Sequence, residues 1–257
     1  MKTAKGCILF SLLLNGLIAL VMFVSGCATT ATETKSVSAT AQDATDAAIE
    51  RYIRTHPEVI EQSLQALEVK REAELRDRQK AALATRQQNL LHDPTSPVSG
   101  NPKGEITLVE FYDYRCGYCK RAAPAVTELQ KIDPRVRVVY KDFPILGEPS
   151  ELAAKAALAS QAQGKHQAFH EALLASHADM TKDEILNIAV SVGLNVKRLE
   201  ADMANPKWQA VIEKNRALAQ ELGISGTPGF IVGNELVPGA LDLNGLKELI
   251  ARAGHEK

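Results

Sequence analysis

Several residue types are scarce in this 257-residue chain, and each scarcity argues against particular kinds of structure or function. Four cysteines are too few for a dense disulfide framework. Aromatic residues make up 5% and there is one tryptophan, Trp208, which we expect in the core rather than in a cofactor site. The formal net charge of −1 argues against a large basic surface for nucleic acid. The 45% hydrophobic content still allows a packed core, in one domain with appendages or two small ones.

The first 26 residues have the pattern of an export signal. Two lysines precede an apolar run from Ile8 to Val24, which is also nearly long enough to be a retained transmembrane helix of about 20 residues. The segment that follows, Val24-Ser25-Gly26-Cys27, resembles the lipobox of bacterial lipoproteins, whose cysteine becomes acylated after cleavage. The resemblance implies a membrane lipid anchor on Cys27. Because Ala28 rather than aspartate follows, it also implies a periplasm-facing protein of a Gram-negative outer membrane.

The cysteine inventory leaves one pair for chemistry. Cys7 would leave with the signal peptide and Cys27 would carry lipid, so only Cys116 and Cys119 remain. A two-residue spacer closes too small a loop to stabilise a fold much. The pair therefore indicates redox exchange or metal binding.

Composition divides the rest of the chain. Residues 27–42 are small and polar, which predicts a flexible tether, and residues 43–92 are rich in strong helix formers, which predicts a helical stalk. A break is expected at Thr55 to Glu58, with Thr55 as N-cap, Glu58 completing a capping box and Pro57 in the first turn. Three prolines and two glycines between 93 and 104 mark a boundary before a domain at 93–257.

The stalk carries an apolar stripe that an isolated helix cannot bury. Ile53, Ile60, Leu64 and Leu67 follow helical spacing. We therefore expect a homo-oligomer, a dimer or trimer, and a monomeric domain once residues 43–92 are deleted. The alternative is that the helix packs on its own domain.

The sequence pattern of residues 93–257 predicts an α/β domain. Strands are predicted at 106–111 and 136–140, with a hairpin at 229–237. A helical insertion of about 145–222 lies between them. Its helices are predicted at 151–163, 165–176, 181–192 and 206–222, and a closing helix at 243–253.

The dithiol lies between a strand and a helix. The segment Cys116-Gly117-Tyr118-Cys119 follows the first strand and precedes a helix-prone run, so Cys116 is expected at a helix N-terminus. Unpaired backbone N–H groups and the helix dipole there favour a thiolate. This predicts Cys116 as nucleophile and Cys119 as resolving thiol.

Residues 110–120 around the dithiol resemble the active-site segment of DsbA-like thioredoxin-fold proteins. The similarity includes Pro124, where the thioredoxin helix is kinked, and Glu110, six residues before the first cysteine. It also includes Gly226-Thr227-Pro228-Gly229, which matches the family's cis-proline loop. The resemblance covers about 98–253 and implies a thioredoxin fold with an inserted helical domain.

The resemblance also implies roles. Glu110, paired with Lys141 on the neighbouring strand, would relay the proton that Cys119 loses; the alternative is an ordinary buried ion pair. The backbone of Thr227, before a cis Pro228, would pair with an extended substrate. Without histidine in the Gly117-Tyr118 loop, the enzyme should be a milder oxidant than C-x-H-C relatives.

The helical extension is similar to the suppressor-of-copper-sensitivity C type of oligomeric disulfide isomerase. This implies disulfide isomerase or oxidase activity on exported proteins with disulfides or free thiols, and a membrane redox partner that supplies oxidising or reducing equivalents. The alternatives are a reductase in cytochrome maturation, a Cu(I)-binding periplasmic lipoprotein and a structural lipoprotein with a vestigial dithiol.

Six histidines complete the inventory. Only His166 and His170 have a spacing that could suit a metal, and no third ligand lies near them in the sequence. We expect an exposed pair on a helix, no metal site and no cofactor.

Overall fold

The computed structural model describes residues 33–254 and divides the chain into two compact units, between Ala66 and Leu67. The predicted signal peptide and Cys27 lie outside the described residues. Within the described part, no helix combines the length and apolar character needed to cross a membrane.

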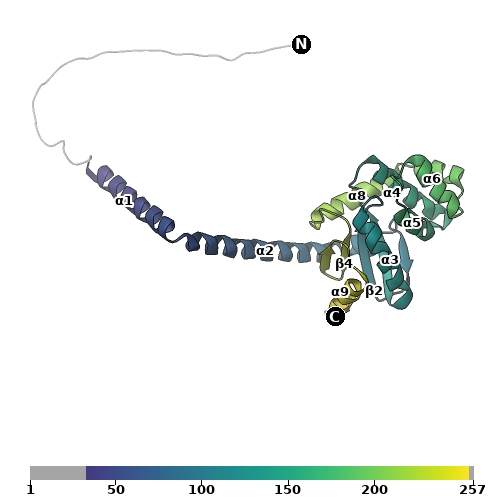
Figure 1. The fold of residues 1–257 in the computed structure, drawn as a ribbon, viewed down its shortest axis with the longest axis horizontal. Coiled ribbons are helices and arrows are strands. Elements are labelled where there is room, and N and C mark those ends of the chain that lie inside the picture. Colours follow the sequence, from purple (N-terminus) through teal and green to yellow (C-terminus); the bar gives the residue numbers. More distant parts are fainter. Residues whose placement is uncertain (1–32, 255–257) are drawn as a thin grey trace, which may run out of the picture. The chain divides into compact units, whose positions relative to one another are not determined.

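The first unit is helical from its first described residue. Helix α1 (Glu33–Thr55) precedes α2 (Pro57–Leu91), and only the start of α2 belongs to this unit (Figure 1). The flexible tether predicted to reach residue 42 is therefore wrong from Glu33 onward. Neither glycine nor proline interrupts 33–55, and alanines recur through this stretch, so a helix can continue.

The break between the two helices lies at His56. Pro57 opens α2 as predicted, but Thr55 is not its N-cap. Its hydroxyl donates backwards to the Arg51 carbonyl at 2.9 Å and so ends α1. A threonine hydroxyl can bond a carbonyl four residues earlier, and here that local bond is made instead of the cap.

Apolar side chains of the first unit are exposed. Ile53 and Ile60 are 38% and 42% exposed, and other large side chains are more so. They include Ile49, Tyr52 and Leu64. A single copy of the chain therefore leaves this predicted stripe in water.

The second unit contains a five-stranded sheet in the order β1-β3-β2-β4-β5. Only β2 and β3 are parallel; the other neighbouring pairs are antiparallel. The strands are β1 (Val98–Gly100), β2 (Ile106–Tyr112), β3 (Val136–Asp142), β4 (Gly229–Val232) and β5 (Glu235–Pro238). The predicted α/β architecture is therefore present.

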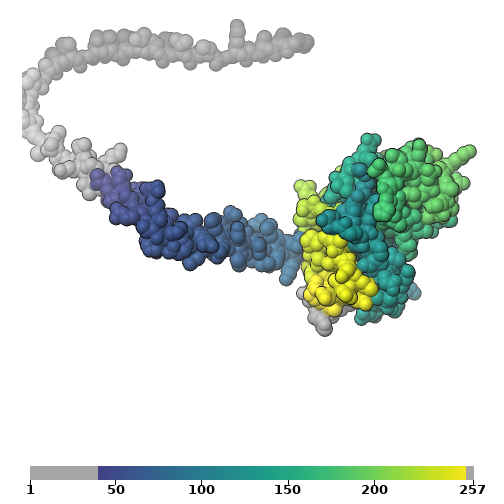
Figure 2. Space-filling view, viewed as in Figure 1, coloured from purple at the N-terminus to yellow at the C-terminus, as the bar shows by residue number. Residues whose placement is uncertain are grey.

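Helices surround this sheet and form the insertion between β3 and β4 (Figure 1). Helix α3 (Gly117–Ile132) follows β2, and α9 (Leu243–Gly254) packs beside it at the surface (Figure 2). The insertion comprises α4 (Glu148–Ser160), a short 3-10 turn η1 (Gln161–Gln163), α5 (His166–Ala175), α6 (Lys182–Ser191), α7 (Val196–Met203) and α8 (Lys207–Glu221). The capping box predicted at α6, Thr181 with Glu184, is confirmed.

Alternate residues of the sheet build two cores. Leu108 and Phe230 point to the side of α3, whereas Val109 and Phe111 point to the opposite side. On that opposite side they meet the C-terminal part of α8 and two fully buried leucines of α2. These leucines are Leu83 and Leu90.

The end of α2 is therefore part of the second unit. Arg86 forms an ion pair with Glu221 of α8 at 2.6 Å, and Gln79 donates to the Leu222 carbonyl at 3.1 Å. The boundary predicted at residues 92–93 thus cuts through packed structure. The end of α2 carries apolar residues that pack against the sheet, whereas the prolines after it mark only a loop and not a domain boundary.

Candidate active site

Cys116 lies at the start of α3, as predicted. It is the N-cap residue in an extended conformation, and its carbonyl accepts the first helical hydrogen bond, from Lys120 N at 3.0 Å. Cys119 lies one turn further and is completely buried. The two cysteines are present as free thiols. Pro124 lies inside the same helix.

The loop before β4 meets this helix start. The Thr227–Pro228 peptide bond is cis, as the resemblance implied. The Cys116 thiol donates to the Thr227 carbonyl at 3.2 Å, which joins residues 111 apart in sequence. The structure therefore brings the dithiol and the proline loop together.

The two sulfurs have opposite proton affinities. The hydrogen bond with the Cys119 thiol, aided by Thr227 and opposed by burial, lowers the pKa of Cys116 to about 5. The same hydrogen bond, then burial, then the charge of Glu110 raise the pKa of Cys119 far above its usual range. At neutral pH the arrangement gives a Cys116 thiolate and a protonated Cys119.

Glu110 lies in β2 on the same side as Cys119. Burial raises the pKa of its carboxyl to about 8, and Oε1 has no hydrogen-bond partner among the described residues. A buried carboxyl with that pKa is mostly protonated at neutral pH. Its charge contributes to the raised pKa of Cys119, and the proton-relay role that the resemblance implied stays a prediction.

Lys141 does not pair with Glu110, and this part of the prediction is wrong. The β2–β3 register sets Glu110 opposite Tyr140, so Lys141 points to the other face of the sheet. There its ammonium donates to the Asn89 carbonyl at 2.6 Å and pairs with Asp93 at 3.5 Å. Burial lowers the pKa of Lys141 to about 8, and Asp93 opposes the fall.

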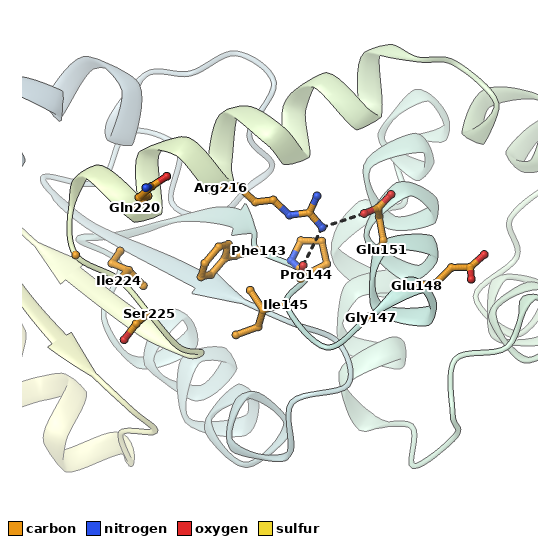
Figure 3. Close-up of a pocket in the computed structure, with 11 residues that line it drawn as sticks. Phe143, Pro144, Ile145, Gly147, Glu148, Glu151, Arg216, Gln220, Ile224 and Ser225 are labelled. Carbon is orange, nitrogen blue, oxygen red and sulfur yellow. Dashed lines mark hydrogen bonds and ion pairs between the residues drawn. The ribbon is translucent and has the colours of Figure 1, made fainter.

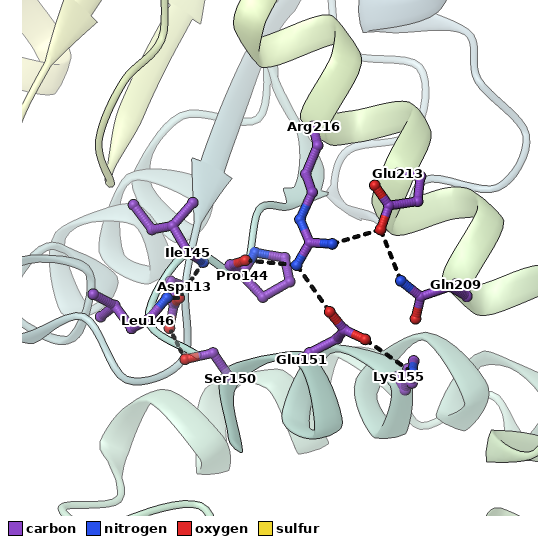
Figure 4. A network of polar contacts seen from close by, with 10 residues as sticks. All are labelled: Asp113, Pro144, Ile145, Leu146, Ser150, Glu151, Lys155, Gln209, Glu213 and Arg216. Atoms are coloured by element: carbon purple, nitrogen blue, oxygen red, sulfur yellow. Dashed lines mark hydrogen bonds and ion pairs between the residues drawn. The ribbon is translucent and has the colours of Figure 1, made fainter. Parts of the chain in front are cut away.

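Asp113 is a structural residue that the sequence did not reveal. Its carboxylate accepts hydrogen bonds from the backbone N–H groups of Ile145 and Leu146 and from the Ser150 hydroxyl at 2.8 Å (Figure 4). It also accepts one from Arg115 N at 2.7 Å. The segment before Cys116 is thereby fastened to the β3–α4 loop.

Arg216 of α8 holds that loop from the other side. Its guanidinium donates to the Pro144 carbonyl at 3.0 Å and to Glu151 of α4 at 2.9 Å (Figure 4). It also pairs with Glu213. Two exposed apolar side chains, Ile145 and Leu146, are therefore presented by a firmly held loop.

Two hollows flank the segment that leads to the cis proline. One, of about 460 Å³, is lined by Tyr118, Thr227 and Pro228 together with Leu236 of β5. The other, of about 820 Å³, opens between the β3–α4 loop and the end of α8 (Figure 3). Residues 223–225 line both hollows. Only the first is lined by a residue of the dithiol loop, so it is the better candidate for a substrate groove.

Tyr118 is the exposed edge of this groove. It is 58% exposed, and the Arg121 guanidinium lies over its ring at 4.1 Å from the centroid. An aromatic ring held by a cation offers an apolar contact surface beside the reactive sulfur. Gly117, the other residue of the loop, opens α3.

His166 and His170 are buried, so the exposed pair predicted for α5 is wrong. They stack at 5.6 Å between ring centroids, and His170 also packs at 4.3 Å on Tyr140. Helix spacing put both on one face, but only packing could show that this face is inward. No group of three or more metal-binding side chains occurs within the described residues. Trp208 is buried, as predicted.

Comparisons with known proteins agree with this geometry. Residues 107–251 match the DSBA-like thioredoxin domain family. A thioredoxin-like oxidoreductase from Silicibacter pomeroyi DSS-3 is 46% identical, with a TM-score of 0.64 over 65% of this chain and 97% of that one. A linker-deletion mutant of Proteus mirabilis ScsC is 25% identical, with a TM-score of 0.65 over 91% of this chain and 100% of that one.

A curated relative shows that the domain also occurs within larger proteins. The Na⁺/H⁺ antiporter NhaA 3 of Salinispora tropica is 29% identical over 158 residues, which are 61% of this chain. The chain spans about a quarter of that relative's length, 24%. Together with the sheet order, the dithiol at the start of α3 and the facing cis proline, the family match shows that the chain belongs to the DSBA-like thioredoxin domain family and has its thiol–disulfide oxidoreductase fold.

Proposed function

We propose that this protein catalyses thiol–disulfide exchange in exported proteins through Cys116 and Cys119. The observation that carries the proposal is the Cys116 sulfur itself. It lies at a helix start, within 3.2 Å of the Thr227 carbonyl, and has a pKa lowered to about 5. Low-pKa, partly accessible thiols are the ones that attack disulfides.

The exchange proceeds in two steps. The Cys116 thiolate attacks a client disulfide, and the displaced client sulfur leaves as a thiolate. The resulting mixed disulfide resolves when Cys119, after losing its proton, attacks the Cys116 sulfur and releases the client thiol. Attack by another client thiol instead leaves the dithiol reduced and produces a rearranged client disulfide. The same pair thus serves oxidation, reduction and isomerisation.

An extended client segment is the substrate that the groove suits. The Thr227 backbone, beside the reactive sulfur, can pair with another chain as a sheet edge does. Tyr118 and Leu236 line the same groove and offer apolar contacts. Glu110 is the buried carboxyl whose charge contributes to the raised pKa of Cys119, and it is proposed to take up the Cys119 proton.

Isomerisation is proposed to depend on a homo-oligomer, a dimer or a trimer. The similarity to ScsC extends over 91% of this chain, and the stalk exposes its apolar stripe in a single copy. Several dithiols around one misfolded client raise the local concentration of active sites. A membrane redox partner would then keep the dithiol in its working oxidation state.

A periplasmic location is supported by a solved relative described as a periplasmic thioredoxin-like protein, from Salmonella enterica, which is 32% identical. We place the protein on an outer membrane through a lipid on Cys27. Replacing Cys27→Ala should move the full-length protein from the membrane fraction to the soluble periplasmic fraction. Retention in the membrane would argue for an uncleaved helix.

The test of the function is refolding of a scrambled disulfide substrate by full-length protein. Wild type should restore native disulfides. Cys116→Ser should abolish this, whereas Cys119→Ser should accumulate a mixed disulfide with the client. Equal turnover by both variants would refute the roles, and the same assay with added Cu(I) examines copper binding.

A further inference from the structure

Helix α2 supplies one side chain to the wall of the substrate groove. Gln79 lines the hollow of about 460 Å³ beside the dithiol, together with Tyr118 of the dithiol loop and residues 223–229, which contain the cis proline. Among the described residues that line this groove, Gln79 is the only one with a side-chain amide. A helix that lies outside the matched family segment, residues 107–251, therefore takes part in the groove.

The position of Gln79 is fixed by contacts between α2 and α8. Its Nε2 donates to the carbonyl of Leu222, the C-cap residue of α8, at 3.1 Å. Leu83, one turn further along α2, is fully buried, and Arg86 pairs with Glu221 of α8 at 2.6 Å. Residues spaced by four and then three lie on one face of a helix. The same face of α2 that packs on the domain therefore holds the Gln79 amide beside the groove.

The Gln79 amide keeps an acceptor for a ligand. A side-chain amide can donate through its nitrogen and accept through its oxygen. The nitrogen is used by the Leu222 carbonyl, whereas Oε1 accepts no hydrogen bond from the part of the chain that the structure describes. The side chain is half-buried. A client N–H can therefore bind Oε1 without first breaking a contact inside the protein.

The groove leaves room for a main chain. Gly226 and Gly239 line it, and a Cβ added at either position would meet no atom of the described residues within 4 Å. Another chain can approach the backbone closely at such points. A client strand that pairs with Thr227 points only alternate N–H groups at that edge. The remaining client N–H groups need other acceptors in the groove.

We propose that Gln79 determines specificity for extended clients: its Oε1 accepts a hydrogen bond from a main-chain N–H of the client segment that lies in the groove. The inference rests on the proposed exchange function and adds a substrate contact outside both the dithiol and the proline loop. Its consequence is that α2, which begins as the exposed stalk, also takes part in client binding.

This contact distinguishes disulfides by the main chain attached to them. A disulfide on a single blocked cysteine carries no extended chain and reacts without the hydrogen bond to Gln79. An extended polypeptide forms that bond while its sulfur is attacked, so the bond lowers the barrier for this class of substrate. Every residue except proline carries a main-chain N–H. Gln79 therefore selects extended chains without selecting a particular sequence.

The test compares two probes on reduced full-length protein. One is a short unstructured peptide whose single cysteine carries thionitrobenzoate, and the other is a blocked cysteine with the same group. The Cys116 thiolate attacks the probe's cysteine sulfur, a mixed disulfide forms, and thionitrobenzoate leaves with the bonding electron pair and is followed by absorbance. Gln79→Met, which keeps the length of the side chain, should slow the peptide reaction about fivefold and leave the blocked cysteine unchanged.

A second measurement identifies the hydrogen bond itself. Each peptide amide in turn is replaced by an ester, which removes one N–H and keeps the shape of the chain. One of these esters should slow wild type about fivefold, and the same ester should cause no further loss in Gln79→Met. A merely structural role of Gln79 would leave every ester with the same effect in both proteins.

Arg86→Met is the matched control, because it removes another contact between α2 and α8 but does not line the groove. It should react with both probes as wild type does. The inference is overturned if Gln79→Met matches wild type, if it slows both probes equally, if Arg86→Met reproduces its effect, or if no ester is coupled to Gln79. Failure of wild type to release thionitrobenzoate from either probe would instead refute the proposed function.

Discussion

At the scale of single residues, one hydrogen bond decides which sulfur keeps its proton. The contact between the two thiols is the largest cause both of the lowered pKa of Cys116 and of the raised pKa of Cys119. Cys116 keeps 8% of its surface accessible at the helix start, whereas Cys119 is completely buried. Position and proton affinity therefore assign the same roles to the two residues.

The first prediction follows from that bond. In Cys119→Ala the pKa of Cys116 should rise from about 5 toward the usual range, because its largest stabilising contact is lost. Thiolate absorbance against pH measures the shift. In Cys119→Ser, whose hydroxyl can still donate, the rise should be smaller. An unchanged titration in Cys119→Ala would contradict the assignment.

The second prediction concerns Glu110. Its folded pKa of about 8 lies above the 4.5 of an unperturbed glutamate, so the folded state keeps a proton that the unfolded chain releases. Wild type should therefore lose stability as pH rises from about 4.5 to 8. Glu110→Gln removes this loss and should become the more stable protein by a few kcal/mol at pH 8. Urea unfolding of both proteins in one redox state at pH 4.5 and 8 tests this; a constant difference would contradict it.

At the scale of elements, the end of α2 packs against the sheet and belongs to its hydrophobic core. Leu83 and Leu90 lie fully buried against β2 and β3, and Lys141 binds the Asn89 carbonyl near the helix end. A cation near a helix C-terminus also interacts favourably with the helix dipole. One helix thus begins as exposed stalk and ends as core.

Truncation tests this division. A chain that begins at Leu67 should fold and keep its dithiol chemistry, whereas one that begins at Asp93 loses two buried leucines worth about 1.5–3 kcal/mol each. The Asp93 chain should therefore unfold at a much lower urea concentration. Equal urea midpoints would show that α2 contributes nothing to the domain. Deletion of residues 43–92 is consequently a poor way to obtain the monomer.

Lys141 offers a finer test on the same element. Lys141→Met should lower the free energy of unfolding by about 3 kcal/mol, since it breaks a buried ion pair. The pKa of Cys116 should not move, because Lys141 lies on the sheet face away from the dithiol. Unfolding and thiolate titration are measured on one preparation. A shifted Cys116 titration would instead support the predicted proton relay in which Lys141 acts together with Glu110.

At the scale of the whole molecule, the exposed apolar stripe of the stalk indicates association with another chain. An apolar stripe on a helix is ordinarily buried against another element, and this stripe finds no cover within its own unit. Self-association through the stalk is the proposal that uses these residues. It would gather several dithiols without changing any one of them.

Charge placed on the stripe tests the assembly. The double substitution Ile60→Asp with Leu64→Asp should give a monomer by light scattering, because buried unpaired carboxylates oppose helix association. Isomerase activity should fall several-fold while oxidation by a single dithiol persists. Val190→Asp, on the exposed face of α6, is the control. A monomeric wild type, or a charged variant with full isomerase activity, would contradict the proposal that isomerisation depends on self-association through the stalk.

The sequence alone determined the features that depend on neighbours along the chain. The place of Cys116 at a helix start, the capping box of α6 and the α/β order follow from local patterns, and those patterns were sufficient. The three-residue β1 and the helix α7 were missed because such short segments carry little periodicity.

Only the tertiary structure decided which faces are buried and which residues meet across the sheet. A shift of one position turned Lys141 away from Glu110, and packing brought His166, His170 and Asp142 inside. The end of α2 joined the core for the same reason. Local propensity sets where helices and strands form, but burial depends on contacts between residues far apart in sequence, and these exist only once the chain has folded.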